Sequence, residues 1–387
     1  MKYSRNQINK AGEILLTSKN EEKIRSAIDI INDWRELHLP VLDELHNDIV
    51  SFLNEVNVEI HFVSSRLKRL SSIQNKLDRK PGMKLGGVQD IGGLRIVVPT
   101  ISVLNKAYDV LSNNIYEHFE LTKNPVDYVL KPQDTGYRSI HFIYKYKSKN
   151  SDLNEMKVEL QLRTKLQHSW AMAVETAELI TGTALKSGQG DAEWLSFFRI
   201  VSSIFANKEG TAILAEHIDN NYTHQKLLQQ LYKLNSENNF VDKLKAMNAS
   251  ITHSQKEDHK NGYYILNINF EQKTVTIKAF PKNMKKEASD WYSNLEKNVE
   301  EKKNAVVLVS VPKMQELQEA YPSYFLDTNN FIETIETEMK KELGNLDEKT
   351  FPQFVAEFYP ESHEQYVKDE KEFSDLVERN IKIMEEH

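Results

Sequence analysis

Two neighbouring segments of alternating polarity constrain the fold of this chain most. Residues 139–147 (SIHFIYKYK) and 156–164 (MKVELQLRT) both predict β-strands, and the residues 148–154 that join them are polar. A short polar connection of this kind is typical of an antiparallel hairpin. The second strand carries apolar residues at every other position, namely Met156, Val158, Leu160 and Leu162. Between them lie Lys157, Glu159, Gln161 and Arg163, so we expect one buried face and one polar face.

The rest of the chain predicts helices around this sheet and a second, smaller unit. A length of 387 residues exceeds what one core usually fills. Apolar spacing predicts helices over 5–80, 103–115, 165–180, 192–206 and 211–250, and a strand over 93–98. Beyond a polar stretch, the expected order is strands at 263–270 and 274–280, a helix at 284–303, a strand at 305–311 and helices from 313 onward.

We therefore expect an α+β protein with two domains. The first domain, residues 1–252, would hold a mixed or antiparallel sheet flanked by helices. Residues 253–261 would form a linker, residues 262–345 a small α+β domain, and residues 346–387 an acidic helical tail.

Missing residue types exclude several functions. The chain has no cysteine, which rules out disulfides, thiolate zinc sites, iron–sulfur clusters and cysteine catalysis. No apolar run is long enough to span a bilayer, and the first residues lack the hydrophobic block of a signal peptide. We therefore expect a cytoplasmic protein with no membrane partner and no zinc.

The formal net charge of −7 is unevenly distributed. From Glu342 to the C-terminus there are 13 acidic and 5 basic residues, a net charge of −8, so the rest of the chain carries about +1. Within that rest, residues 66–84 hold seven basic residues against the single acidic Asp78. Such a block predicts a site for phosphates or an RNA backbone. A solvated helix face is the alternative.

A pair of carboxylates lies close to this basic block. Asp90 comes just before the strand at 93–98, in which Arg95 alternates with the apolar Ile96. Glu159 lies on the polar face of its own strand. Carboxylates on two strands can hold Mg²⁺ against a nucleoside triphosphate. No G-x-x-x-x-G-K-[ST] motif occurs, so phosphate binding would depend on side chains.

Five motifs in order resemble the RelA/SpoT-type (p)ppGpp synthetase domain. Residues 89–98 (QDIGGLRIVV) resemble its D-I-x-G-[IL]-R signature, and residues 66–76 resemble its basic segment around ATP. Asp127-Tyr128, Lys131-Pro132 and residues 136–141 (GYRSIH) are similar to the D-Y, K-P and G-Y-x-S-[IL]-H blocks. Residues 159–171 resemble E-[IV]-Q-[IL]-R-T followed by H-x-W-A. The resemblance covers roughly residues 40–210 and implies a nucleotidyltransferase-like fold.

The resemblance implies a pyrophosphokinase that moves the β,γ-pyrophosphate of ATP to a 3′-hydroxyl. Asp90 and Glu159 would hold Mg²⁺, and Glu159 would also assist deprotonation of the acceptor. The implied triphosphate ligands are Lys68, Ser72, Lys76, Arg163 and His168. Arg95, with either Arg66 or Arg69, would sandwich the adenine. On the acceptor side, Tyr137 would stack on the base, and His141 and Gln161 would complete the site.

The C-terminal half indicates which group of these synthetases the chain resembles. No His-Asp dipeptide occurs, so the hydrolase half of long Rel enzymes is missing, and residues 321–324 are Tyr-Pro-Ser-Tyr. This layout resembles the CapRel family of fused toxin–antitoxin synthetases, whose zinc-finger-like C-terminal domain lacks the metal ligands. The resemblance implies a tRNA 3′ end as acceptor and autoinhibition by Tyr321 and Tyr324, which is released by a phage capsid protein. We expect Arg79, Lys80 and Lys84 to bind tRNA phosphates.

Two other interpretations of the sequence remain open. The chain could be an alarmone synthetase that makes (p)ppGpp or (p)ppApp under the control of an ordinary regulatory domain, because the shared motifs bind ATP and do not report on the acceptor. It could also be an inactive RNA-binding scaffold, although the presence of both carboxylates argues against that. For the tyrosine pair, the alternative is that both rings pack into the core of the small domain.

Overall fold

The computed structural model describes residues 3–114, 116–181, 183–248, 252–254, 262–269, 272, 274–296, 304–311, 315–321 and 328–345. Most of the expected linker, the expected tail at 346–387 and Tyr324 lie outside these residues. No helix of the described part is both long and apolar enough to cross a membrane.

One mixed sheet runs through the molecule, as expected for an α+β protein. In order across the sheet, its strands are β3 (Phe119–Leu121), β5 (Ile140–Tyr146), β6 (Lys157–Thr164), β2 (Gly92–Val98), β1 (Phe62–Leu67), β10 (Asn304–Ser310), β8 (Tyr263–Asn269), β9 (Thr274–Phe280) and β7 (Thr252–Ser254). The short β4 (Val126–Asp127) pairs with β5. The predicted hairpin is confirmed, because β5 and β6 pair antiparallel. β6 and β2 pair in parallel.

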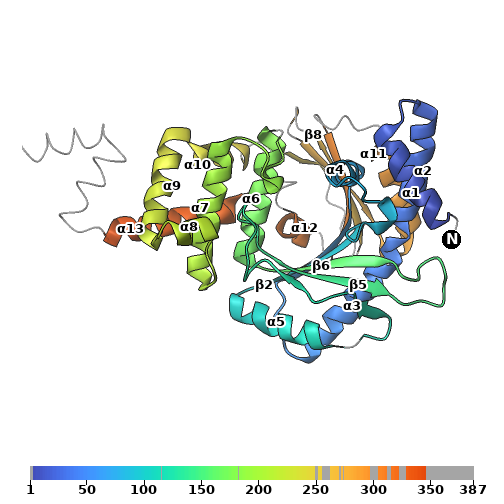
Figure 1. Cartoon of the computed structure of the whole chain (residues 1–387), viewed down its shortest axis with the longest axis horizontal. Helices are drawn as coiled ribbons and strands as arrows, with labels where there is room; N and C mark the ends of the chain where they lie inside the picture. The colour runs from blue at the N-terminus through green and yellow to red at the C-terminus, as the bar shows by residue number, and fades with distance from the viewer. Residues whose placement is uncertain are drawn as a thin grey trace, which may run out of the picture.

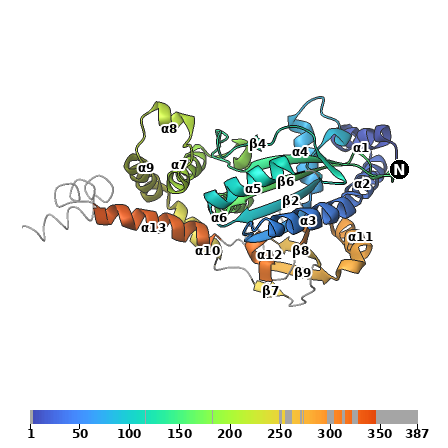
Figure 2. The same cartoon turned by 90° about the horizontal axis from the view of Figure 1, so that it is seen from below.

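Helices cover both faces of the sheet and extend beyond one end of it (Figures 1 and 2). The N-terminal helices are α1 (Arg5–Thr17), α2 (Glu21–Glu36), α3 (His38–Glu55) and α4 (Leu70–Arg79), and α5 (Ile101–Asn113) follows β2. A second group consists of α6 (Lys165–Thr181), α7 (Ala192–Glu209), α8 (Ala215–Asp219), α9 (His224–Asn238) and α10 (Phe240–Asn248). The C-terminal half adds α11 (Lys285–Glu296), α12 (Gln315–Ala320) and α13 (Asn329–Asn345). The 3₁₀ turns are Leu85–Gly87, Leu185–Ser187 and Lys282–Met284.

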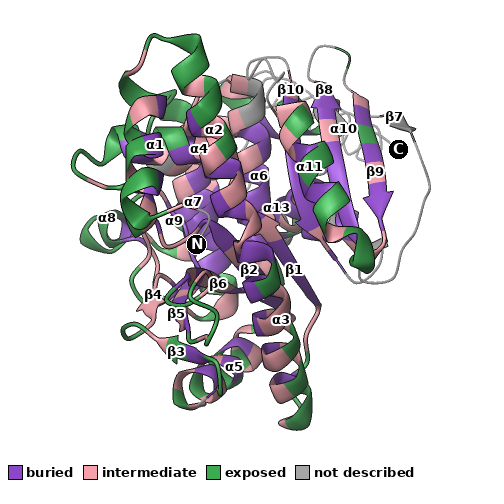
Figure 3. Ribbon diagram, turned by 90° about the vertical axis from the view of Figure 1, so that its right-hand side faces the viewer, coloured by how far each residue is buried: buried purple, intermediate pink, exposed green. Residues whose placement is uncertain are grey.

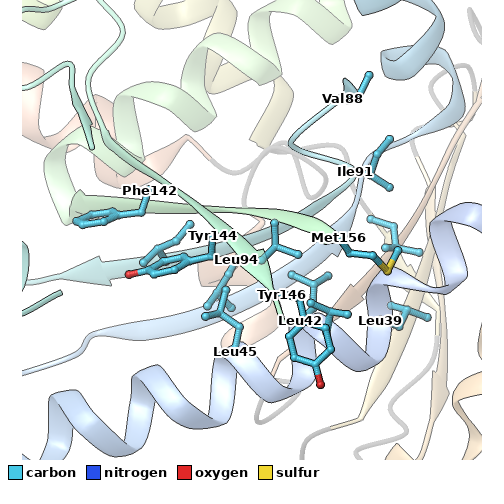
Figure 4. Packing of buried hydrophobic residues seen from close by; sticks show 14 of the residues in the cluster. Leu39, Leu42, Leu45, Val88, Ile91, Leu94, Phe142, Tyr144, Tyr146 and Met156 are labelled. Carbon is cyan, nitrogen blue, oxygen red and sulfur yellow. The ribbon is translucent and has the colours of Figure 1, made fainter. Parts of the chain in front are cut away.

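The main core lies between α3 and the sheet. Leu42 and Leu45 of α3 face Leu94 of β2 and the rings of Phe142 and Tyr144 of β5 (Figure 4), and all five side chains are buried. Burial of each side chain of this size stabilises the fold by roughly 1.5–3 kcal/mol. This packing holds one face of β2, β5 and β6, so their opposite face is available for polar side chains.

The expectation of helix throughout residues 5–80 is wrong at residues 62–67. These residues form β1, which pairs antiparallel with β2 on one side and with β10 on the other. α3 ends before β1, where Asn57 takes a positive φ of 54°, a conformation that favours helix termination. Burial of both faces removes the alternation that marks a half-buried strand, and this explains why the local pattern does not indicate one.

The C-terminal half is built onto this same sheet. The register pairs Ser65 with Ser310 and Arg66 with Val309, so β10 and β8 continue the sheet beyond β1. Figure 3 shows these strands as largely buried. After α12 the chain reaches the second helix group, where Phe331, Ile332 and Ile335 of α13 are buried. The C-terminal half therefore contacts the first half both at the sheet and at the second helix group.

Candidate active site

A small cavity lies on the polar face of β1, β2 and β6. Its volume is about 90 Å³, and its lining residues are Ser64, Arg66, Lys68, Asp90, Gly93, Leu94, Arg95, Glu159, Gln161 and Tyr321. The strand register explains this set. Ser64, Arg95 and Gln161 lie opposite one another across three strands, and Arg66, Gly93 and Glu159 form the next row. Because opposed residues share a face, the alternation predicted from the sequence places these side chains in one cavity.

Asp90 is ionised and is held by two lysines. Its carboxylate oxygens accept hydrogen bonds from Lys68 Nζ at 2.8 Å and from Lys76 Nζ at 2.9 Å. Burial acts to raise the pKa of Asp90, but the two ammonium groups outweigh it and hold the pKa well below its usual range. Both lysines belong to the predicted triphosphate cradle, so Asp90 offsets part of the positive charge of the cradle in this state.

Glu159 is also ionised. Its carboxylate accepts from Gln161 Nε2 at 2.7 Å and lies 3.1 Å from His141 Nδ1. Burial acts to raise the pKa of Glu159, whereas His141 and Gln161 lower it below its usual value. Two ionised carboxylates lining one cavity suit Mg²⁺, which prefers oxygen ligands and keeps its remaining positions for water and phosphate. The described residues hold no cluster of three or more acidic or histidine side chains that could cage a metal alone.

Two guanidinium groups, those of Arg66 and Arg95, line the cavity, and Arg163 lies close to them. Burial lowers the pKa of Arg95 to about 10, and the nearby charges of Arg163 and Arg66 add to this effect. Mutual repulsion among buried cations is unfavourable, so such a cluster favours binding of an anion such as a triphosphate.

Glu175 and Lys186 lie near the arginines of the cavity but were not among the residues predicted from the sequence. Glu175 pairs with Lys186. Burial acts to raise the pKa of Glu175, but Lys186, Arg66 and Arg95 hold it well below its usual value. The available signal was helical spacing, because Glu175 lies seven residues after His168 in α6 and therefore on the same face. Lys186 lies in a loop of small residues, and nothing in the sequence around it indicated that it would lie near the site.

The predicted acceptor residues Tyr137, His141 and Gln161 form one hydrogen-bonded network with Arg163. The Tyr137 hydroxyl lies 2.8 Å from His141 Nε2 and accepts from Arg163 Nη2. Arg163 also donates to Gln161 Oε1 at 2.8 Å. Burial acts to raise the pKa of Tyr137, but Arg163 and His141 lower it to about 7. The structure thus brings these residues together, with Tyr137 only 8% exposed.

Tyr321 comes from the C-terminal half and forms part of the wall of the cavity. It is 1% exposed, and its hydroxyl donates to the backbone oxygen of Ser65 at 3.1 Å. The Arg95 guanidinium carbon lies 5.5 Å from the centre of the ring, and Arg95 Nη1 donates to the Ala320 oxygen at 2.9 Å. Arg95 is thereby held by the end of α12, which Figure 1 shows near the centre of the molecule.

The other predicted site residues do not line the cavity. Ser72 lies half-buried on α4, and Arg69 is the residue before that helix. His168 is buried and packs edge-on against Phe62, with 5.1 Å between ring centres. The three basic residues expected to bind tRNA are exposed at the end of α4 and just after it, namely Arg79, Lys80 and Lys84.

Comparisons with known proteins identify the family of the segment that carries the site. Residues 65–179 match the family model described as a region found in RelA / SpoT proteins. The chain is 30% identical over 157 residues to GTP pyrophosphokinase YwaC of Bacillus subtilis, covering 37% of this chain and 73% of that protein. It is 26% identical over 147 residues to a GTP pyrophosphokinase of Haemophilus influenzae, covering 38% of this chain and 18% of that protein.

Among solved structures, small alarmone synthetase 2 from Bacillus subtilis aligns with 44% of this chain and 89% of its own. The sequence identity is 25% and the TM-score is 0.38. The family match spans the segment that carries Asp90, Glu159 and the basic residues of the cavity. The chain therefore belongs to the RelA/SpoT family of pyrophosphokinases, which are diphosphate-transferring enzymes.

Proposed function

We propose that this pyrophosphokinase transfers pyrophosphate from ATP to the 3′-hydroxyl of the terminal adenosine of tRNA, and that its own C-terminal half holds it inactive. A phage capsid protein that binds the C-terminal half would release it, so that translation stops in an infected cell. The observation that carries the proposal is Tyr321, whose ring lies beside Arg95 in the cavity that also contains Asp90 and Glu159.

The size of the cavity supports inhibition at the ATP site. Its volume of about 90 Å³ is far below the roughly 300–1,000 Å³ of typical ligand pockets. An aromatic ring beside a guanidinium uses the same stacking that would hold an adenine. Tyr321 would therefore compete directly with the base of ATP for Arg95.

The polar residues of the site suit the proposed transfer once Tyr321 has left. Asp90 and Glu159 would hold Mg²⁺, which would neutralise charge on the transferred phosphoryl groups when bound. Lys68 and Lys76 would donate to the triphosphate instead of to Asp90. Glu159, ionised at neutral pH, would take the proton of the 3′-hydroxyl as its oxygen attacks the β-phosphorus and AMP leaves.

Exposed charge favours tRNA as the acceptor. Arg79, Lys80 and Lys84 lie outside the cavity on the surface, where a large polyanion can reach them. Phosphate contacts of this kind provide affinity that does not depend on sequence. Binding of a mononucleotide in the cavity would not require these three residues.

Synthesis of an alarmone is the second candidate. The relatives from Bacillus subtilis and Haemophilus influenzae are named GTP pyrophosphokinases, which favours a guanine nucleotide as acceptor. In that case the C-terminal half would regulate nucleotide synthesis.

The proposed roles of the two halves follow the expected domain boundaries. Residues 1–252 would be the synthetase, and residues 262–345 would be a regulatory domain of zinc-finger-like build without zinc. Pairing of β10 with β1 supports this assignment, because it anchors the regulatory strands to the strand that carries Ser64 and Arg66.

The test uses the full-length Tyr321→Ala variant and ATP labelled on its γ-phosphate. GDP, GTP, ATP and tRNA are offered in turn, and the products are separated by thin-layer chromatography and gel electrophoresis. Label on the tRNA 3′ end supports the proposal, and label on a nucleotide alone supports alarmone synthesis. No transfer to any acceptor by folded protein would contradict the proposal that loss of Tyr321 releases the active site.

A further inference from the structure

The end of α11 meets the start of α4, the helix that carries the proposed ATP ligands Ser72 and Lys76. Glu296 is the last residue of α11, and its side chain is only 9% exposed. Its Oε1 accepts a hydrogen bond from the backbone N–H of Leu70 at 2.9 Å. Leu70 is the first residue of α4, and the preceding Arg69 makes no side-chain cap.

Buried groups hold the Glu296 carboxylate in this position. Arg35 of α2 is 1% exposed and donates to it. Arg35 is itself oriented by Asn32, whose Oδ1 accepts from Arg35 Nη1 at 2.9 Å. Tyr292, one turn earlier in α11, donates to Glu296 Oε1 at 2.8 Å and also contacts Arg35. Burial acts to lower the pKa of Arg35, whereas Tyr292 and Glu296 raise it above its usual value, so Arg35 remains charged.

A carboxylate at this place is favourable for α4 in two ways. The first N–H groups of a helix have no partner within the helix, and an acceptor that satisfies one of them stabilises the first turn. A negative charge there also interacts favourably with the helix dipole. The ordered helix carries Lys76 to Asp90, where the two side chains are 2.9 Å apart.

We propose that Glu296 is a positioning residue for ATP binding, which acts by capping α4 from the C-terminal half of the chain. This inference depends on the proposed function in assigning Ser72 and Lys76 to ATP. The C-terminal half then has two opposed and separable roles, because Tyr321 blocks the site while Glu296 orders one of its walls. A chain without residues 262–345 would lose both.

The experiment compares two double variants in full-length Tyr321→Ala protein. Arg35→Met with Glu296→Gln removes the buried ion pair but keeps an oxygen acceptor for Leu70 N–H. Arg35→Met with Glu296→Met also removes the acceptor at nearly equal volume. Neither variant leaves an unpaired buried charge, which would by itself destabilise the fold. Binding of labelled ATP with Mg²⁺ is measured by equilibrium dialysis, so the acceptor need not be known.

We expect the Met double variant to bind ATP about fivefold more weakly than the Gln double variant, the loss typical of a missing cap. Amide hydrogen exchange in the first turn of α4 should be faster in the Met variant, with equal exchange in α7 of both proteins. Equal ATP binding by the two variants would overturn the proposal. Equal loss of protection in α4 and α7 would also overturn it, because Glu296 would then stabilise the whole fold.

Lys76→Ala in the same background separates this inference from the proposed function. Weaker ATP binding in Lys76→Ala supports the assignment of α4 to the ATP site. If Lys76→Ala leaves ATP binding unchanged, the assignment fails and the role of Glu296 fails with it. If Lys76→Ala weakens ATP binding while the two double variants bind equally, only the role of Glu296 is wrong.

Discussion

The ring of Tyr321 lies 5.5 Å from the guanidinium carbon of Arg95 and is held from its other end by the backbone of Ser65. Tyr321 and Ser65 are 256 positions apart in the chain, yet Tyr321 lines the cavity that contains both candidate metal ligands. A single side chain from the C-terminal half thus forms part of the wall of the cavity in which we expect the nucleotide to bind.

Replacement of Tyr321 should activate the enzyme. Holding leakage to about 1% requires the closed form to be favoured by roughly 2.7 kcal/mol, and a desolvated cation–π contact contributes about 2 kcal/mol of this. Tyr321→Ala should therefore raise pyrophosphate transfer by full-length protein at least tenfold, measured with γ-labelled ATP. Tyr321→Phe keeps the ring and removes only the hydrogen bond to Ser65, so its activity should lie between those of Ala and wild type.

Toxicity provides a second measurement for the same residue. Expression of Tyr321→Ala should stop growth, and adding Glu159→Gln should restore it. A folded but inactive Tyr321→Ala protein would mean that inhibition lies elsewhere, and an unfolded one would mean that the ring is a core residue. Tyr324→Ala is expected to activate in the same way as Tyr321→Ala.

Loss of either candidate metal ligand should abolish transfer. Asp90→Asn and Glu159→Gln preserve the shape of the side chain and remove one negative charge each. In either variant the Mg²⁺ site would keep only one of the two negative charges that the protein supplies. Each variant, made in the Tyr321→Ala background, should retain less than about 1% of the activity, and the double variant should be no worse, because the pair acts as a unit. Substantial turnover by either folded single variant would refute the assignment.

Charge removal at the surface should weaken binding of tRNA but not of ATP. In Arg79→Ala/Lys80→Ala/Lys84→Ala, the slope of log affinity against log salt should fall by about two to three, because each phosphate neutralised by a basic side chain contributes nearly one to this slope. A matched control removes three exposed lysines from the N-terminal region, namely Lys10, Lys19 and Lys23. Equal tRNA binding by the two triple variants would contradict the proposed surface.

Stability should fall in mild acid because of His38. Its Nδ1 lies 2.9 Å from the Trp34 oxygen, and its ring packs edge-on against Trp34. Burial lowers the pKa of His38 from 6.5 to about 4. Between these values the unfolded chain binds more protons than the folded one, so the free energy of unfolding decreases as pH falls through this window.

The size of this effect can be measured against a neutral replacement. The shift corresponds to at most about 3 kcal/mol of stability between about pH 6.5 and about pH 4. His38→Gln keeps a donor for the Trp34 oxygen but does not titrate. Urea unfolding at about pH 7.5 and about pH 4.5, on either side of most of this window, should show a smaller loss of stability in the variant than in wild type. An identical loss in both proteins would exclude His38 as a source of acid sensitivity.

Local patterns predicted those parts of the site whose residues share a strand. Alternation in residues 156–164 placed Glu159 and Gln161 on one face, and the structure confirms that both line the cavity. The same argument placed Arg95 opposite Ile96. These predictions succeeded because the period of a strand is a local property of the backbone.

Other features could not be predicted, because they depend on pairing between distant segments. Residues 62–67 lack the alternation of a half-buried strand, and they form a strand only because β2 and β10 pair on either side of them. Arg35 has the spacing of an ordinary charged residue in an amphipathic helix, but it is buried against Glu296. No residue near either of these positions in the sequence indicates the partner.

The sequence by itself determined the chemistry of this protein. It set the carboxylates Asp90 and Glu159, the basic residues around them, the family, and the alternation that directs these side chains to one face. Only the tertiary structure decided which contacts these side chains make with the C-terminal half. In it, Tyr321 lies against Arg95 and Glu296 caps α4. The physical reason is that side-chain type and backbone period are local, whereas a contact across 256 positions forms only when buried area and hydrogen bonds over the whole chain outweigh the entropy of closing the loop.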